Sequence, residues 1–139
     1  MTDAVKSPLQ ELAERFQQAV SSAFGPEHAG VDPLVRRSDR ADFQANLAMS
    51  LGKSLKRPPR DVAQALLAAL QVDDICDKVE IAGPGFINLT LKNDYFDGLL
   101  AATLQDPRLG VGTTSKPDTV VIDYGGPNVA KEMHVGHLR

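Results

Sequence analysis

The sequence is poor in cysteine, with Cys76 as the only one in 139 residues. A single cysteine excludes an internal disulfide framework and a cysteine-based zinc cluster. Long apolar runs are also missing, because no stretch approaches the roughly 18 residues that a membrane-spanning helix needs. The N-terminus MTDAVKSPLQ lacks the basic stretch and apolar core of a signal peptide. We therefore expect a cytoplasmic protein that folds around an ordinary hydrophobic core.

Acidic residues are scarce between residues 36 and 60, although the whole chain carries a net charge of −3. This segment has two acidic and seven basic residues, a net +5 that leaves −8 for the rest of the chain; the basic ones are Arg36, Arg37, Arg40, Lys53, Lys56, Arg57 and Arg60. A basic stripe on an acidic protein is typical of an RNA-binding surface. A solvated helical face would carry the same charges, so charge alone leaves both interpretations open.

Apolar spacing predicts three helices in the first half of the chain. The first follows the pair Ser7-Pro8, which suits an N-cap and a first helical residue, and Gly25-Pro26 ends it. The second runs from Asp42 to Lys56, and the third follows Pro58-Pro59. Between the first two helices, VDPLVRR predicts a short strand, and its proline places this strand at a sheet edge.

The segment KVEIAGPGFINLTLK, residues 78–92, has the clearest strand pattern. Apolar and polar residues alternate on both sides of Gly83-Pro84-Gly85, as in a hairpin with one face toward a core. No helix follows these glycines directly and no Lys-Ser/Thr pair completes a phosphate loop, which favours a turn. A last helix begins at Asn93 as its cap, and its apolar residues are Phe96, Leu99, Leu100 and Leu104. We therefore predict an α+β domain over residues 1–105, with helices packed on one face of a small antiparallel sheet.

A change of composition predicts a domain boundary after this unit. Residues 106–118, DPRLGVGTTSKPD, are rich in Gly, Pro, Ser and Thr, as in a linker. Val120-Val121-Ile122 then predicts a strand buried on both faces of a parallel sheet. Residues 119–139 are expected to be the truncated start of a second domain.

The tail GGPNVAKEMHVGHLR combines groups that suit a nucleotide. A helix that begins near His134 would direct its N-terminal N–H groups toward a phosphate. His134 and His137 would share one helical face and can donate hydrogen bonds to phosphate oxygens, while Lys131 supplies positive charge. Asn128 offers a donor and an acceptor to a polar substrate. A metal site is disfavoured, because two histidines are too few ligands and His28 lies far away in the sequence.

Phe43, Gln44 and Asn46 are candidates for contact with RNA. An aromatic ring beside two carboxamides, close to basic residues, suits stacking on and hydrogen bonding to an unpaired base. Phe43 also fits the apolar stripe of the helix predicted over residues 42–56, so a core role for its ring stays open. Gln44 and Asn46 lie off that stripe.

Three stretches resemble one family. PNVAKEMHVGHLR, residues 127–139, resembles the first signature of class I aminoacyl-tRNA synthetases, in the longer form found in arginyl-tRNA synthetases. DRADFQANLAMSLGKSLKRPPRDVA and VEIAGPGFINLTL are similar to the N-terminal additional domain of the bacterial members. The resemblance covers nearly all of the chain from about Asp39 onward. It implies that residues 119–139 begin a Rossmann-like catalytic domain.

The resemblance also implies roles for particular residues. His134 and His137 would contact ATP and stabilise the transition state of adenylate formation, with Lys131 assisting, and Asn128 would line the arginine pocket. The additional domain would bind tRNA(Arg) at its D-loop through Phe43, Gln44 and Asn46. The residues expected to bind substrate or ATP are Pro127, Asn128, Val129, Ala130, Lys131, Glu132, Met133, His134, Val135, Gly136 and His137.

The expected function is therefore that of the N-terminal part of an enzyme that activates arginine with ATP and passes it to tRNA. We expect ATP to be accompanied by Mg²⁺, and we expect no bound prosthetic group, no membrane partner and a monomer. One strand and the start of a helix cannot form a nucleotide pocket, so the 139 residues are expected to be inactive alone. Two alternatives stay open: a free-standing RNA-binding module with a vestigial signature, and another class I-like nucleotidyltransferase.

Overall fold

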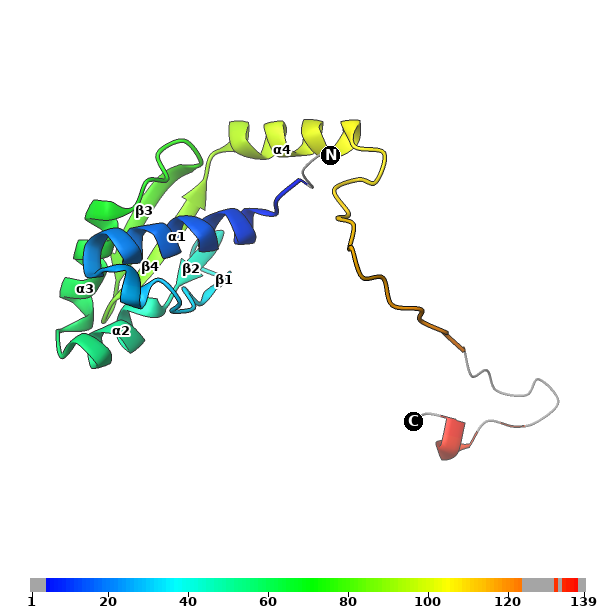
Figure 1. Cartoon of the computed structure of the whole chain (residues 1–139), viewed down its shortest axis with the longest axis horizontal. Coiled ribbons are helices and arrows are strands. Elements are labelled where there is room, and N and C mark those ends of the chain that lie inside the picture. Colours follow the sequence, from blue (N-terminus) through cyan, green and yellow to red (C-terminus); the bar gives the residue numbers. More distant parts are fainter. Residues whose placement is uncertain (1–4, 124–131, 133, 138–139) are drawn as a thin grey trace.

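A four-stranded antiparallel sheet carries three helices on one face (Figure 1). The computed structural model describes residues 5–123, 132 and 134–137. Along the sheet the strand order is β1-β2-β4-β3, and every neighbouring pair is antiparallel. The strands are β1 (Val35–Arg37), β2 (Phe43–Ala45), β3 (Cys76–Ala82) and β4 (Phe86–Leu91), and the packed helices are α1 (Pro8–Phe24), α2 (Leu47–Leu55) and α3 (Pro59–Ala69). This architecture confirms the predicted α+β fold.

Strand β4 shows why the sheet has one buried face. Ile87, Leu89 and Leu91 are buried, while Asn88 and Thr90 between them are half-buried, because successive side chains point to opposite faces. The buried side meets α1, α2 and α3 in one hydrophobic cluster. The helical members of this cluster are Leu12, Phe16, Ala19, Val20, Leu47, Ala48, Leu51, Val62, Ala63 and Leu66.

The residues that begin and end α1 make the capping interactions expected from their chemistry. Ser7 caps α1 and forms a capping box with Gln10, and Pro8 is the first helical residue. Gly25 ends the helix, and the short 3-10 helix Pro26–His28 follows it. The edge strand predicted near Pro33 is confirmed as β1, and the predicted hairpin is confirmed as β3 and β4.

The hairpin turn packs closely against the start of α3. A Cβ added to Gly85 would lie 2.9 Å from the carbonyl oxygen of Pro59, and Gly85 has φ of +142°. Gly52 in α2 approaches the same proline, since a Cβ there would lie 3.2 Å from its Cα. Both glycines therefore allow two elements to meet around Pro59.

The prediction of a helix over residues 42–56 is wrong for the first residues of this segment. Phe43, Gln44 and Ala45 form strand β2, and α2 begins only at Leu47. β2 pairs with β1 on one side and β4 on the other, and Asp42 accepts a hydrogen bond from the Leu91 backbone N–H at 2.8 Å. These long-range bonds decide the local structure of a segment whose apolar spacing also fits a helix.

Helix α4 (Asn93–Gln105) leaves the sheet at the end of β4 and projects beyond it (Figure 1). Its N-cap is Lys92, so Asn93 is the first helical residue rather than the predicted cap. None of the helices among the described residues is long and apolar enough to span a membrane.

The strand predicted at residues 120–122 is absent from the described chain. Residues 111–123 form no helix or strand and are exposed; Val120, Val121 and Ile122 are 74%, 89% and 67% exposed. A strand needs a hydrogen-bonding neighbour, and the described residues offer none at this point. Further along, Val135–His137 forms a single turn of 3-10 helix close to the predicted helix start.

Candidate functional site

The face of the sheet opposite the helices carries a transverse row of four polar side chains. Arg36, Gln44, Asn88 and Glu80 are direct partners across neighbouring strands, in the order β1, β2, β4, β3. Directly opposed residues of antiparallel strands share a face, so all four lie on the side away from the core. Three strand spacings make this row about 14 Å long. We call it the polar row.

A hydrogen bond fixes the centre of the polar row. The Gln44 side-chain Nε2 donates to Asn88 Oδ1 at 2.7 Å, and both residues are half-buried. This bond orients both carboxamides, which leaves the Gln44 carbonyl oxygen and the Asn88 amide group as a neighbouring acceptor and donor. A fixed donor–acceptor pair is the arrangement that can bind the edge of a base.

Asn46 lies at the end of β2 and caps α2 without a side-chain hydrogen bond to the helix. Its Oδ1 is buried and has no hydrogen-bond partner among the described residues. An unsatisfied buried acceptor costs about 1–3 kcal/mol. Because this oxygen is buried, Asn46 does not present it to a ligand in this conformation, and the sequence alone gave no sign that it would be unsatisfied.

The structure separates the two predicted roles of Phe43. Its side chain is 7% exposed and belongs to the core, where Leu89 is its cross-strand partner. The ring would have to leave the core to stack on a base, so its position favours the core role. Gln44, the next residue, lies on the open face.

Sequence reasoning missed Phe86 and Asn88, which lie on the same face as Gln44. Phe86 is half-buried, pairs with Ala82 and stands two residues before Asn88 on β4. The signal was present in the alternation of β4, because an aromatic residue occupies a position on the polar side of that strand. An aromatic ring beside carboxamides on an open sheet face is a stacking platform for single-stranded RNA.

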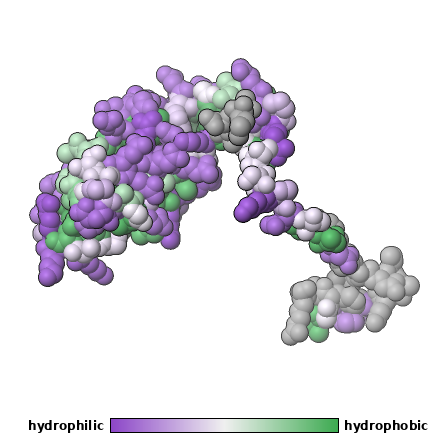
Figure 2. Space-filling view, in the orientation of Figure 1, coloured by the Kyte–Doolittle hydropathy of each residue, from purple (hydrophilic) through white to green (hydrophobic). Residues whose placement is uncertain are grey.

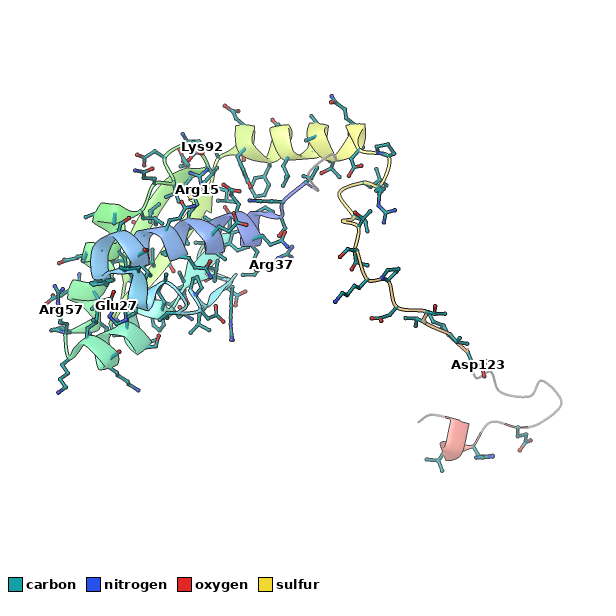
Figure 3. All side chains as sticks on the ribbon, viewed as in Figure 1. Arg15, Glu27, Arg37, Arg57, Lys92 and Asp123 are labelled. Atoms are coloured by element: carbon teal, nitrogen blue, oxygen red, sulfur yellow. The ribbon has the colours of Figure 1, made fainter. Side chains whose placement is uncertain are left out.

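The basic residues of segment 36–60 do not form one patch. Arg36, Arg37 and Arg40 lie in or just after β1, whereas the other four lie near the end of α2 and the start of α3. Figure 3 places Arg37 and Arg57 at opposite ends of the folded domain. Of the first group, Arg36 belongs to the polar row, whereas Arg37 is the cross-strand partner of Phe43 and lies on the other face of the sheet.

The signature segment is described only in part. Pro127, Asn128, Val129, Ala130, Lys131 and Met133 lie outside the described residues. Glu132, His134, Val135 and Gly136 are exposed, and His134 Nδ1 accepts a hydrogen bond from the Gly136 backbone N–H at 3.2 Å. His137 is the last residue of the 3-10 turn.

The groups with shifted pKa values lie away from the open face. Arg15 on α1 donates two 2.7 Å hydrogen bonds to the Asp74 carboxylate, which hold the pKa of Asp74 below its usual value. Burial raises the pKa of the Cys76 thiol to about 11. The Arg15–Asp74 pair joins α1 to the segment before β3, and the raised pKa keeps the Cys76 thiol protonated at neutral pH.

Two family profiles divide the chain. The profile described as "Arginyl tRNA synthetase N terminal domain" matches residues 10–91, which is more than half of the chain. The chain belongs to the arginyl-tRNA synthetase family. A second profile, "tRNA synthetases class I (R), catalytic domain", matches residues 99–139.

Curated relatives agree with this assignment. The chain is 53% identical over 132 residues to "Arginine--tRNA ligase" of Thermobifida fusca, a match that covers 95% of this chain and 23% of that protein. It is 47% identical over 136 residues to the protein of the same name from Synechococcus elongatus, covering 96% of this chain and 23% of the relative. The chain thus spans about 23% of the length of these synthetases.

Solved arginyl-tRNA synthetases share the fold. The Thermus thermophilus enzyme superimposes with a TM-score of 0.60 and 26% identity, covering 95% of this chain and 21% of its own. The Plasmodium falciparum enzyme gives a TM-score of 0.56 over 66% of this chain and 17% of its own, and at 19% identity this likeness concerns the fold alone.

Proposed function

We propose that the chain is the N-terminal part of an arginine–tRNA ligase. The whole enzyme activates arginine with ATP, as its Mg²⁺ complex, and transfers the arginyl group to tRNA(Arg). The observation that carries the proposal is the 53% identity to the Thermobifida fusca ligase over 95% of this chain. We place the enzyme in the cytoplasm and expect a monomer.

In this proposal residues 1–105 bind tRNA, residues 106–118 link the two parts, and residues 119–139 begin the catalytic domain. His134 and His137 donate hydrogen bonds to ATP, and Lys131 offsets the charge that develops on its α-phosphate. Asn128 contacts arginine, and the other residues of the run 127–137 line the pocket. In-line attack of the arginine carboxylate on the α-phosphate expels pyrophosphate and leaves the adenylate.

The polar row and Phe86 are the tRNA-binding surface in this proposal. Phe86 stacks on an unpaired base, and the coupled carboxamides of Gln44 and Asn88 bind the edge of that base. Asn46 contacts tRNA once its side chain rotates, because its Oδ1 is buried in the described structure. Phe43 supports this face from the core side, and Arg36 at the end of the row contacts the phosphate backbone.

The test of RNA binding is a titration of the 139-residue protein with a tRNA(Arg) transcript, followed by fluorescence anisotropy. We expect Gln44→Ala and Asn88→Ala each to weaken binding about tenfold, because each removes half of the base-reading pair. Gln64→Ala is the matched control, since Gln64 is an exposed carboxamide on α3. The assigned surface would be contradicted if Gln64→Ala weakened tRNA binding as much as Asn88→Ala does, or if neither Gln44→Ala nor Asn88→Ala weakened it.

Catalysis is tested in a chimera that joins residues 1–139 to the part of the Thermobifida fusca ligase beyond its matched segment. We expect arginine-dependent ATP–pyrophosphate exchange by the chimera and none by the 139 residues alone. His134→Ala or His137→Ala should lower the exchange rate by about 10²-fold or more. His28→Ala, in the 3-10 helix after α1, should leave it unchanged. A chimera whose rate is insensitive to both signature histidines would contradict the assigned roles.

A further inference from the structure

Helix α4 presents an apolar stripe that no described residue covers. Phe96, Leu100 and Leu104 recur every four residues and are 39%, 59% and 69% exposed. No residue of α4 is buried, and in its first turn Tyr95 packs against the core. Figure 2 shows hydrophobic atoms exposed over this helix. A helix of 13 residues is marginal in water by itself, so such a stripe is expected to be buried against a partner.

The boundary between the two family profiles falls at this helix. The N-terminal profile ends at Leu91, the last residue of β4, and the catalytic profile begins at Leu99, inside α4. The match to the catalytic profile therefore begins within α4. The curated relatives extend far beyond this segment, since the chain covers 23% of their length.

The apolar surface continues from α4 onto α1. Leu9, which is 42% exposed, and Phe96 both line a cleft of about 590 Å³ between the start of α1, the segment that joins β1 to β2, and α4. Arg37 and Asp42 also line this cleft and give it charged groups. An apolar centre with charged groups is usual for an interface between domains.

The base of α4 is tied to the sheet. The Lys92 backbone N–H donates to the Ile75 carbonyl at 2.9 Å, and the Lys92 ammonium group donates to the Asp73 carbonyl at 2.5 Å. Both acceptors precede β3, so two bonds hold the junction between β4 and α4. A domain that binds α4 is therefore held in a fixed position relative to β4 and to the sheet face that carries the polar row.

We propose that the apolar stripe of α4, with Leu9, is the docking surface for the class I catalytic domain of the same polypeptide. Once docked, α4 is a rigid spacer that sets the distance between the polar row and the nucleotide site. This inference rests on the proposed continuation into a catalytic domain and does not depend on tRNA binding by the sheet.

Hydrogen exchange measured by mass spectrometry tests the proposal on the 139-residue protein and on the chimera described above. We expect the amides of residues 97–105 to exchange at least about tenfold more slowly in the chimera, because docking suppresses opening of α4. The double variant Leu100→Asp, Leu104→Asp should return exchange in the chimera to within about twofold of the 139-residue protein.

Ala102→Asp is the matched control, because Ala102 is exposed and, at about 100° per residue, lies on the opposite side of α4 from Leu100. It should leave the protection in place. All variants should melt at the wild-type temperature in the 139-residue form, since the replaced side chains are exposed there. Equal exchange in the chimera and the 139-residue protein, or loss of protection in Ala102→Asp, would overturn the proposal.

Sedimentation of the 139-residue protein separates a second copy from the catalytic domain as the occupant. We expect a monomer at all concentrations tested. A dimer that Leu100→Asp dissociates would overturn the proposal in favour of self-association. None of these measurements uses tRNA or turnover, so their failure is distinguishable from failure of the proposed function.

Discussion

At the scale of single residues, Lys56 occupies a backbone conformation that suits glycine better. It ends α2 with φ of +52° and ψ of +39°, the left-handed region, where a Cβ costs about 1 kcal/mol. We expect Lys56→Gly to raise the free energy of unfolding by about that amount in urea denaturation. Lys53→Gly removes the same charge from inside the helix and should lower it by about 1 kcal/mol. A destabilising Lys56→Gly would contradict this account.

The ion pair between Arg15 and Asp74 has a pH signature. Because the pKa of Asp74 is lowered in the folded protein, its carboxylate contributes stability above about pH 4, its unfolded pKa, and loses it as pH falls through the folded value. The effect stays below about 1 kcal/mol, since the Asp74 side chain is 60% exposed. We expect Arg15→Met to raise the pKa of Asp74 in an NMR titration, whereas Arg60→Met should not. An unchanged pKa in Arg15→Met would show that the pair does not persist in solution.

At the scale of elements, the contact between the hairpin turn and α3 depends on Gly85. We expect Gly85→Ala to lower the free energy of unfolding by about 1–3 kcal/mol, because its Cβ would meet the Pro59 backbone and its φ is positive. Gly98→Ala is the control: Gly98 lies in α4 with no atom within 4 Å of an added Cβ, and this change should stabilise by about 0.5–1 kcal/mol. The denaturant midpoints of the two variants measure both changes. If both substitutions changed the free energy of unfolding in the same direction, the prediction would be contradicted.

Some elements could be predicted from the sequence because their signals are local. Ser7-Pro8 fixes the start of α1, and the alternation around Gly83-Pro84-Gly85 identifies the hairpin. β2 could not be predicted, because three residues carry too little alternation and its conformation follows from pairing with β1 and β4. The same pairing decides which side chains reach the open face. The sequence pattern therefore indicated Gln44 as a candidate contact and gave no indication of its cross-strand partner Asn88.

At the scale of the whole molecule, the hydrophobic core is independent of the C-terminal segment. Within the part of the chain that the structure describes, the buried core residues lie between Leu12 and Leu91, whereas residues 111–123 are exposed and without regular structure. Thermolysin, which cleaves before apolar residues, should therefore cut first within 111–123, where Val120, Val121 and Ile122 are available. The remaining domain should keep the melting temperature of the 139-residue protein. First cleavage inside β3 or β4 would contradict this picture.

Strand β2 is one of the shortest strands of the sheet and lies between β1 and β4. It places Gln44 next to Asn88, which is 44 residues further along the chain. During synthesis β1 and β2 leave the ribosome long before β4. The four-stranded sheet can therefore form only after the hairpin of β3 and β4 has been synthesised. A nascent chain that has not yet exposed residues 86–91 carries Gln44 without Asn88 and Phe86. If the proposed surface binds tRNA, this binding arises late in synthesis, because a chain without β4 lacks Asn88 and Phe86.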